Sequence, residues 1–314
     1  MTTTSAHFTL RTMLRDDWDE TAQLIHASLN VWYKKNRGFE LVPGPWETML
    51  VFPRVYEALD PGCCILAVDD KSGRIAGSCF YHPRPTHVAL GIMNVHPEFF
   101  GRRIGPLILR HVIDFARLQK RPLRLVSSLM NLDSFSLYNK VGFKPVQVFQ
   151  DMIMEVPQEG IPYEVPNGWT LRDMLADDVP AVVALERKLC GVYREQDFRF
   201  FMENRDNIWG ASVLFGPDGN LEGWLVSVCD PGSNMLGPGL VRSESGGRLL
   251  ILRELNRHRG RKPVWLVPSD RSELLAAMYA LGAKNCEIHV SQILDGDPAP
   301  PSGIVFPTFM PETS

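Results

Sequence analysis

A glycine-rich turn that carries two arginines lies between a predicted strand and a long predicted helix. Its residues, Asn94 to Gly105, read NVHPEFFGRRIG. Gly101 and Gly105 allow backbone conformations that larger residues disfavour. The first amides of a helix have no partner within the helix, and the helix dipole favours anions at that end. The turn is therefore a candidate pyrophosphate cradle, and the alternative is an ordinary strand-to-helix turn with two solvated arginines.

A second segment of interest follows the next predicted strand, where residues 131–143 read NLDSFSLYNKVGF. The first segment fits the pattern V-x-P-E-[YF]-R-G-x-G-[IVL]-G at Val95, Pro97, Glu98, Phe99, Gly101, Ile104 and Gly105. The second fits N-x-x-[AS]-x-x-[LF]-Y-x-K-x-G-F at Asn131, Ser134, Leu137, Tyr138, Lys140, Gly142 and Phe143. In this order, over residues 8–156, the two patterns resemble the GNAT superfamily of acyl-CoA-dependent N-acetyltransferases.

The resemblance implies that acetyl-CoA is the co-substrate and that an amine attacks its thioester directly. It places these residues at the coenzyme A: Val95, Phe100, Gly101, Arg102, Arg103, Ile104, Gly105 and Asn131. For Asn131 the alternative role is helix capping. A backbone N–H near Val95 would polarise the thioester carbonyl. No metal is expected.

Tyr138 occupies the family position of the group that protonates the leaving thiolate. A phenol suits this role because its ordinary pKa of about 10 lies above the value of about 8.5 for a thiol, so the neutral phenol can donate to sulfur. The alternative is a tyrosine that only packs on a short helix.

Two loop residues depart from the family pattern. Phe100 stands where the family usually has Arg or Gln, and Arg103 stands where it usually has Gly. An arginine at that place either adds a cation for the phosphates or crowds the loop.

The sequence does not identify the general base that must deprotonate the acceptor. Glu98 belongs to the loop pattern and is expected to be a solvated acid, while His96 lies near the strand end. His82 and His87 flank a turn and are expected to be ordinary surface histidines. A base acting through water is equally allowed.

The chain also repeats itself. Residues 9–17 read TLRTMLRDD and residues 170–178 read TLRDMLADD. Later pairs keep the same order, among them residues 122–126 with 263–267. These matches predict two copies of one fold, in a first domain over residues 1–156 and a second over residues 157–314 that ends in a proline-rich tail.

The second copy has lost most of the pattern. It has a glycine pair before a predicted helix but no V-x-P-E, and Glu244 would repel phosphate. Ser272 stands where the first copy has Asn131. We therefore expect a degenerate copy with a structural or substrate-shaping role.

The elements that must position the first segment alternate in type. Strands are expected at residues 8–11, 63–69, 75–82, 87–95, 123–127 and 144–155, and helices at residues 16–30, 46–59, 105–120 and 133–141. The fold class is therefore α/β (α+β), as two tandem GNAT-type mixed-sheet domains with flanking helices.

Composition sets wider bounds. The 314 residues carry a formal net charge of −3, which gives no electrostatic reason to bind nucleic acid. The six cysteines form no C-x-x-C pair, and no apolar run approaches the ~18 residues of a membrane helix. The first ten residues lack the features of a signal peptide, so we expect a reduced, cytoplasmic protein without a membrane partner.

These observations predict an acyl-CoA-dependent N-acetyltransferase whose acceptor is a small-molecule or peptide amine. The alternative is a non-catalytic acyl-CoA-binding or protein-interaction module built on degenerate GNAT domains. The sequence leaves the acceptor, the acyl length and the oligomeric state open.

Overall fold

The computed structural model describes residues 7–313, which divide into two compact units. The first contains the described residues up to Pro83, with His87–Leu123 and Pro311–Thr313. The second contains Arg84–Thr86 and Arg124–Met310. The boundary between the compact units therefore does not lie near residue 156. The division into two domains at that residue stays a prediction, which concerns the two copies of the repeat.

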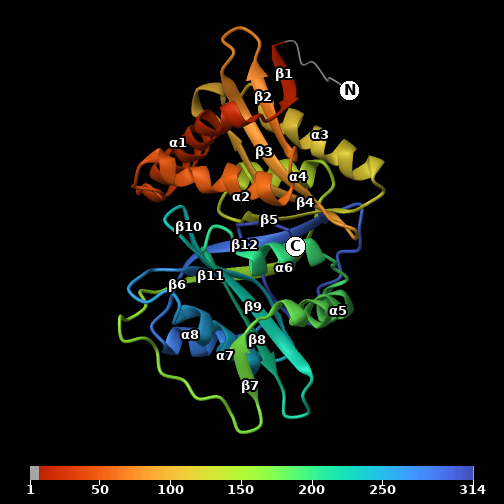
Figure 1. Ribbon diagram of the computed structural model, residues 1–314. Helices are drawn as coiled ribbons and strands as arrows, with labels where there is room; N and C mark the ends of the chain where they lie inside the picture. Colours follow the sequence, from red (N-terminus) through yellow and green to blue (C-terminus); the bar gives the residue numbers. More distant parts are fainter. Residues whose placement is uncertain (1–6, 314) are drawn as a thin grey trace. The chain divides into compact units, whose positions relative to one another are not determined.

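The first unit contains an antiparallel sheet in the order β1-β2-β3-β4, and α1 and α3 pack against β3 and β4 (Figure 1). Its strands are β1 (Phe8–Thr12), β2 (Cys64–Asp69), β3 (Ile75–Pro83) and β4 (Val88–Val95). Its helices are α1 (Trp18–Arg37), α2 (Val51–Leu59) and α3 (Ile104–Leu118), with 3-10 turns η1 (Arg15–Asp17), η2 (Trp46–Leu50) and η3 (Pro97–Phe99). The predicted strands and helices of this segment are confirmed.

Helix α1 is longer than the sequence pattern predicted, since it continues to Arg37 instead of ending near Asn30. Basic residues in its last turn stabilise the negative end of the helix dipole. Gly38 ends the helix at a φ of +79°, and its N–H donates to the carbonyl of Lys34.

The second unit contains a mixed sheet in the order β5-β12-β6-β11-β10-β9-β8-β7, with β13 paired to β10. Its strands are β5 (Leu123–Ser128), β6 (Lys144–Ile153), β7 (Thr170–Asp173), β8 (Trp209–Phe215), β9 (Leu221–Asp230), β10 (Ser233–Val241), β11 (Val264–Pro268), β12 (Lys284–Leu294) and β13 (Ile304–Phe306). Its helices are α4 (Leu132–Lys140), α5 (Val179–Cys190), α6 (Glu195–Glu203), α7 (Glu244–Leu255) and α8 (Ser272–Ala280), with the 3-10 turn η4 (Ala176–Asp178). Strands β10 and β11 run parallel, whereas β6 runs antiparallel to both β11 and β12.

The repeated sequence motif forms the same local structure twice. In the first copy the guanidinium of Arg11 donates to both carboxylate oxygens of Asp17, at 2.6 and 2.7 Å. In the second, Arg172 does the same to Asp178, at 2.6 and 2.8 Å. In each copy the aspartate also accepts the backbone N–H of the leucine three residues earlier. The repeat is therefore structural, because it builds the turn that starts a helix.

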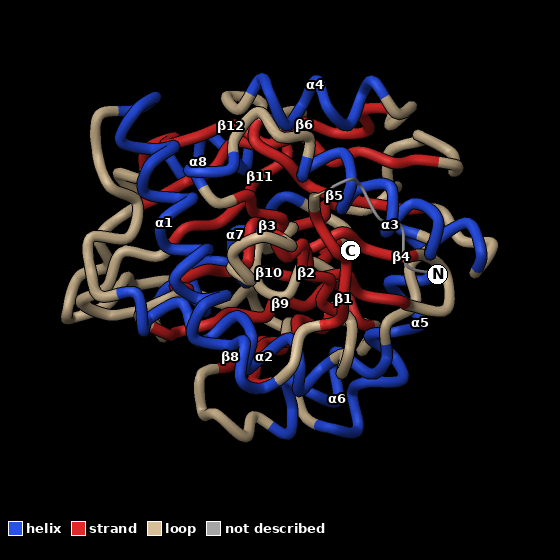
Figure 2. The backbone as a smooth tube through the Cα atoms, turned by 90° about the horizontal axis from the view of Figure 1, so that it is seen from above, coloured by secondary structure: helices blue, strands red, loops and turns tan. Residues whose placement is uncertain are grey.

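The two copies exchange their last strands. Strands β5 and β11 correspond in the repeat, as do β6 and β12, which follow the short helices α4 and α8. Yet β12 lies between β5 and β6, and β6 lies between β12 and β11 (Figure 1, Figure 2). Met152 of β6 is paired with Trp265 of β11 and is fully buried in the core around it.

This exchange predicts that a fragment of residues 1–156 does not fold stably, because β6 would lose both neighbouring strands and Met152 its core. Circular dichroism should show no cooperative thermal transition for the fragment, whereas the full chain shows one. Co-expression of residues 157–314 should restore the transition. A cooperative transition in the isolated fragment would show that β6 does not need the second copy.

Candidate functional site

The phosphate-loop segment forms a tight turn between β4 and α3 in the first unit. Gly101 has a φ of +79° and Arg103, the residue before α3, has a φ of +62°. Gly77 of β3 sets the position of α3, since a Cβ there would lie only 2.8 Å from Cγ2 of Ile104. Only glycine therefore lets the first turn of α3 approach the sheet so closely.

The turn presents backbone N–H groups that nothing in the described chain satisfies. Among residues 7–313 there is no acceptor for the N–H groups of Gly101, Arg103, Ile104 and Gly105. Pro106 follows and has no N–H to offer. Because α3 is 15 residues long, its dipole adds to the partial positive charge of these groups. The arrangement can bind an anion with several oxygens, as a pyrophosphate has.

The side chains of the turn are arranged around this backbone. Arg103 is exposed, and its backbone adopts the left-handed conformation in which glycine is favoured. A Cβ at Gly101 would meet nothing within 4 Å, so glycine is favoured there by its positive φ and not by lack of space. Arg102 lies over the ring of Phe99, with Cζ 5.1 Å from its centroid, and Phe100 is 53% exposed. The predicted loop residues Val95, Phe100, Gly101, Arg102, Arg103, Ile104 and Gly105 are thus brought together on one turn.

Two candidate bases near the loop have other partners. Arg74 donates to the carboxylate of Glu98 at 2.5 Å, and this bond lowers the pKa of Glu98. His96 accepts the N–H of Glu98 at its Nδ1 and so caps the turn that follows β4. Burial, followed by the charge of Arg74, lowers the pKa of His96.

Asn131 and Tyr138 lie on α4, in the second unit. The side chain of Asn131 accepts the N–H of Ser134 at 3.1 Å, so it caps α4, which is the alternative role considered for it. Tyr138 is 6% exposed, and its ring packs edge-on against Phe143 at a centroid distance of 5.7 Å. Tyr138 therefore has the packing role that was considered as its alternative, and this role involves its ring.

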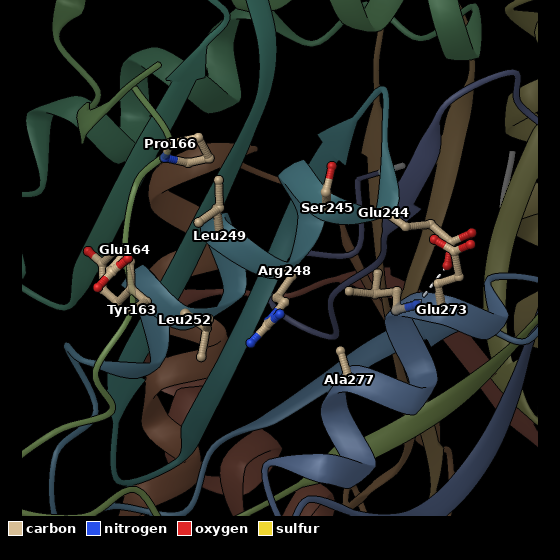
Figure 3. A pocket seen from close by; sticks show the side chains of 11 residues that line it. Tyr163, Glu164, Pro166, Glu244, Ser245, Arg248, Leu249, Leu252, Glu273 and Ala277 are labelled. Atoms are coloured by element: carbon tan, nitrogen blue, oxygen red, sulfur yellow. Dashed lines mark hydrogen bonds between the residues drawn. The ribbon is translucent and has the colours of Figure 1, made fainter. Parts of the chain in front are cut away.

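The corresponding turn of the second copy is capped by its own Ser243. The side chain of Ser243 accepts the N–H of Gly246 at 3.2 Å, and its carbonyl accepts the N–H of Gly247 at 2.9 Å. The carboxylate of Glu244 accepts the N–H of Leu274 in α8 at 2.6 Å. Beside them lies a cavity of about 460 Å³ between α7, α8 and the segment at residues 163–166 (Figure 3). One basic side chain, Arg248, faces this cavity, whereas its lining carboxylates are Glu164, Glu244 and Glu273. The excess of negative charge disfavours phosphate there.

A cluster in the first unit was missed by sequence reasoning. His82 and His87 were expected at the surface, but this was wrong, since each is 1% exposed. His82 binds the carboxylate of Asp60 through its Nδ1 at 2.6 Å, while no described residue forms a hydrogen bond with its Nε2. Glu312, from the C-terminal tail, accepts a hydrogen bond from the hydroxyl of Tyr56 in the same region. Local pattern carries no signal for a contact between residues so far apart in the chain.

Within residues 7–313 there is no group of three or more His, Cys, Asp or Glu side chains that could hold a metal ion. No helix in this range is long and apolar enough to cross a membrane.

Comparison with known proteins finds a family model that matches residues 26–143 and solved structures that share the fold of nearly the whole chain. Residues 26–143 match the model of the acetyltransferase (GNAT) family. A search of curated proteins finds no match. The family match confirms the resemblance of the first copy.

Solved structures match nearly the whole chain at low identity. A putative acetyltransferase from Pyrococcus horikoshii is 16% identical, with a TM-score of 0.73 over 96% of each chain. A GCN5-related N-acetyltransferase from Sphaerobacter thermophilus is 19% identical, with a TM-score of 0.66 over 93% of this chain and 96% of that one. A tandem GNAT protein from the clavulanic acid biosynthesis pathway is 18% identical, with a TM-score of 0.59 over 91% and 98%. The predicted tandem fold is thereby confirmed.

The conformation of Arg103 generates a prediction. Arg103→Asn keeps a residue that tolerates the left-handed region but removes the charge. We expect about 2–5-fold weaker acetyl-CoA binding, the range of one exposed ionic contact, measured by calorimetry at low salt and vanishing at high salt. Lys120→Asn is the matched control, because Lys120 also has a positive φ and lies at the other end of α3. Unchanged affinity for Arg103→Asn would show that its guanidinium points to solvent; tighter binding would show that it obstructs the turn.

Proposed function

We propose that this chain transfers an acetyl group from acetyl-CoA to a primary amine, because residues 26–143 match the model of the acetyltransferase (GNAT) family and the chain shares its fold with a tandem GNAT protein. The observation that carries the proposal is the row of unsatisfied N–H groups at Gly101, Arg103, Ile104 and Gly105. Backbone donors held in this way bind the pyrophosphate of coenzyme A without any rearrangement of the turn.

The proposed reaction is a direct transfer. The amine nitrogen forms a bond to the thioester carbon, and the carbon–sulfur bond breaks. A backbone N–H near Val95 stabilises the negative charge that develops on the carbonyl oxygen. Tyr138 donates a proton to the leaving thiolate, and the nitrogen loses the proton that balances this step. Asn131 holds the start of α4, the helix that carries Tyr138.

The second copy has a supporting role in this proposal. Its turn is capped by Ser243, Glu244 adds a negative charge beside it, and the nearby cavity is acidic. It binds no coenzyme A, and its contribution is β12 and the C-terminal tail. The acceptor is a small-molecule or peptide amine rather than a nucleic acid. We place the protein in the cytoplasm, whose reducing conditions fit its six free cysteines.

One observation favours a second candidate, a non-catalytic acyl-CoA-binding module. Tyr138 is buried against Phe143, and Asn131 is occupied as a cap, so both have complete structural roles. Such a module would bind acetyl-CoA at the same turn but release no coenzyme A in the presence of amines.

The asymmetry between the copies predicts a stoichiometry. Calorimetric titration with acetyl-CoA should give one site per chain, because Ser243 caps the second turn and the carboxylates beside it disfavour phosphate. Ile104→Pro, which removes one of the free N–H donors of the first turn, should weaken binding, whereas Ser245→Pro in the second copy should not. Two equal sites, or a loss of binding with Ser245→Pro alone, would contradict the assignment.

The role of Tyr138 predicts a selective loss of turnover. Tyr138→Phe keeps the ring against Phe143 but removes the hydroxyl, so kcat should fall about 10²–10⁴-fold with acetyl-CoA affinity nearly unchanged. Steady-state release of coenzyme A in the presence of an amine measures this.

Tyr279→Phe is the matched control, since Tyr279 holds the equivalent place on α8 and its hydroxyl donates to Gln150. It should leave kcat unchanged. Full turnover by Tyr138→Phe would identify solvent as the proton source instead.

A further inference from the structure

The C-terminal tail of the chain is part of the first unit. Pro311–Thr313 group with this unit, although the preceding residues, Arg124–Met310, belong to the second. His87 donates from Nε2 to the carbonyl of Thr313 at 2.7 Å, and both residues are buried. The tail is thus fixed in place, and it brings the side chain of Glu312 with it.

Glu312 is held by donors from two elements. Its carboxylate accepts the hydroxyl of Tyr56 on α2 and the backbone N–H of Ile92 on β4. Between the paired residues Cys79–Met93 and Tyr81–Leu90, strand β4 has one residue more than β3. Such a bulge leaves an extra residue outside the ladder, which explains why the Ile92 N–H is available to the tail.

A second polar atom faces the same place. A Cβ at Gly91 would lie 3.3 Å from Oε2 of Glu312 and 3.0 Å from Nε2 of His82. Within residues 7–313 this Nε2 has no hydrogen-bond partner, and its ring is 1% exposed and fixed by Asp60. The carboxylate of the half-buried Glu312 and the buried Nε2 of His82 therefore both lie close to the glycine of the bulge.

The position along β4 connects this cluster to the phosphate turn. Ile92 lies three residues before Val95, about 10 Å along a strand. Val95 ends β4, and the turn that carries the free N–H groups follows. The nearer candidates for a base, Glu98 and His96, are bound to Arg74 and to the backbone.

We propose that Glu312 is the general base of the amine acetylation, supplied to the first copy by the far end of the chain. This inference rests on the proposed function. The carboxylate takes one proton from the acceptor ammonium and passes it to solvent. The neutral amine then attacks the thioester, and its second proton balances the one that the thiolate receives. Tyr56 acts as a positioning residue, because it holds the carboxylate and does not itself accept the proton.

The ionisation of Glu312 suits this role. Burial raises its pKa to about 8, although hydrogen bonds from Tyr56 and from the backbone act in the opposite direction. A base works best when its pKa lies near the working pH. The other ionisable groups around the tail are Tyr56 on α2, Cys79 and His82 on β3, His87 before β4, and Asp60 behind His82. Burial raises the pKa of Tyr56 and Cys79, so both stay neutral as Glu312 titrates.

Two kinds of acceptor test the proposal. A primary alkylamine is protonated at neutral pH and needs a base, whereas hydroxylamine is largely neutral and does not. The alkylamine to be used is the one that the wild-type chain acetylates fastest among a panel of primary alkylamines. Glu312→Gln, which keeps the shape of the side chain, should lower kcat/KM with the alkylamine about 10²-fold. It should leave the rate with hydroxylamine within about threefold and the acetyl-CoA affinity unchanged.

The pH profile distinguishes the base from its positioning residue. Wild-type kcat/KM should rise with pH up to about 8 and then level off, because the carboxylate is the active form. Glu312→Gln should lose this limb. Tyr56→Phe should move it to higher pH, since the hydroxyl favours the ionised carboxylate. Glu312→Asp should recover part of the rate.

The outcomes are distinct. No coenzyme A release by the wild-type chain with any amine would overturn the proposed function and the base together. Equal alkylamine rates for wild type and a folded Glu312→Gln variant would overturn the base alone. A Glu312→Gln variant that is faster than wild type would also overturn the base, because it would show that the tail blocks the site. Loss of the rate in His82→Gln but not in Glu312→Gln would assign the base to His82 instead.

Discussion

A short left-handed turn before α3 determines how the first copy can work. Four of its N–H groups have no acceptor among residues 7–313, and free donors persist only where the surrounding structure holds them. Gly77 lets α3 press against β3, and His96 caps the preceding 3-10 turn. A packed helix on one side and a capped turn on the other therefore hold these four donors in place.

In the second copy the corresponding turn is capped by Ser243, but the fold depends on this copy. Glycine in the first turn allows an unusual backbone conformation, whereas glycine in the second allows close packing. A Cβ at Gly247 would lie 3.2 Å from the ring of Phe306. Its last strand, β12, lies between two strands of the first copy, and its tail carries Glu312. A degenerate copy is thus retained because the exchanged strand and the tail cannot be removed without exposing core and sheet edges.

The sequence predicted local structure well and long-range contacts poorly. The loop pattern, the repeat at residues 9–17 and the helix of residues 104–118 follow from spacing, since turns and amphipathic helices are encoded by neighbours. The strand exchange does not follow from spacing, because the residue pattern of β6 or β12 is the same whichever strand it pairs with. His82 was misjudged because its burial comes from Asp60, Tyr56 and Glu312, and the tail contact spans 256 positions. The place of Asn131 as a cap was an alternative that the sequence could not decide.

We propose that coenzyme A binds to the free N–H groups of the first turn and not to the second copy. Hydrogen–deuterium exchange, measured by mass spectrometry with and without acetyl-CoA, reports on those amides directly. We expect strong protection of residues 100–107 on addition of acetyl-CoA and no change at residues 243–250. Protection at residues 243–250, or unchanged exchange at residues 100–107 under saturating acetyl-CoA, would contradict this proposal.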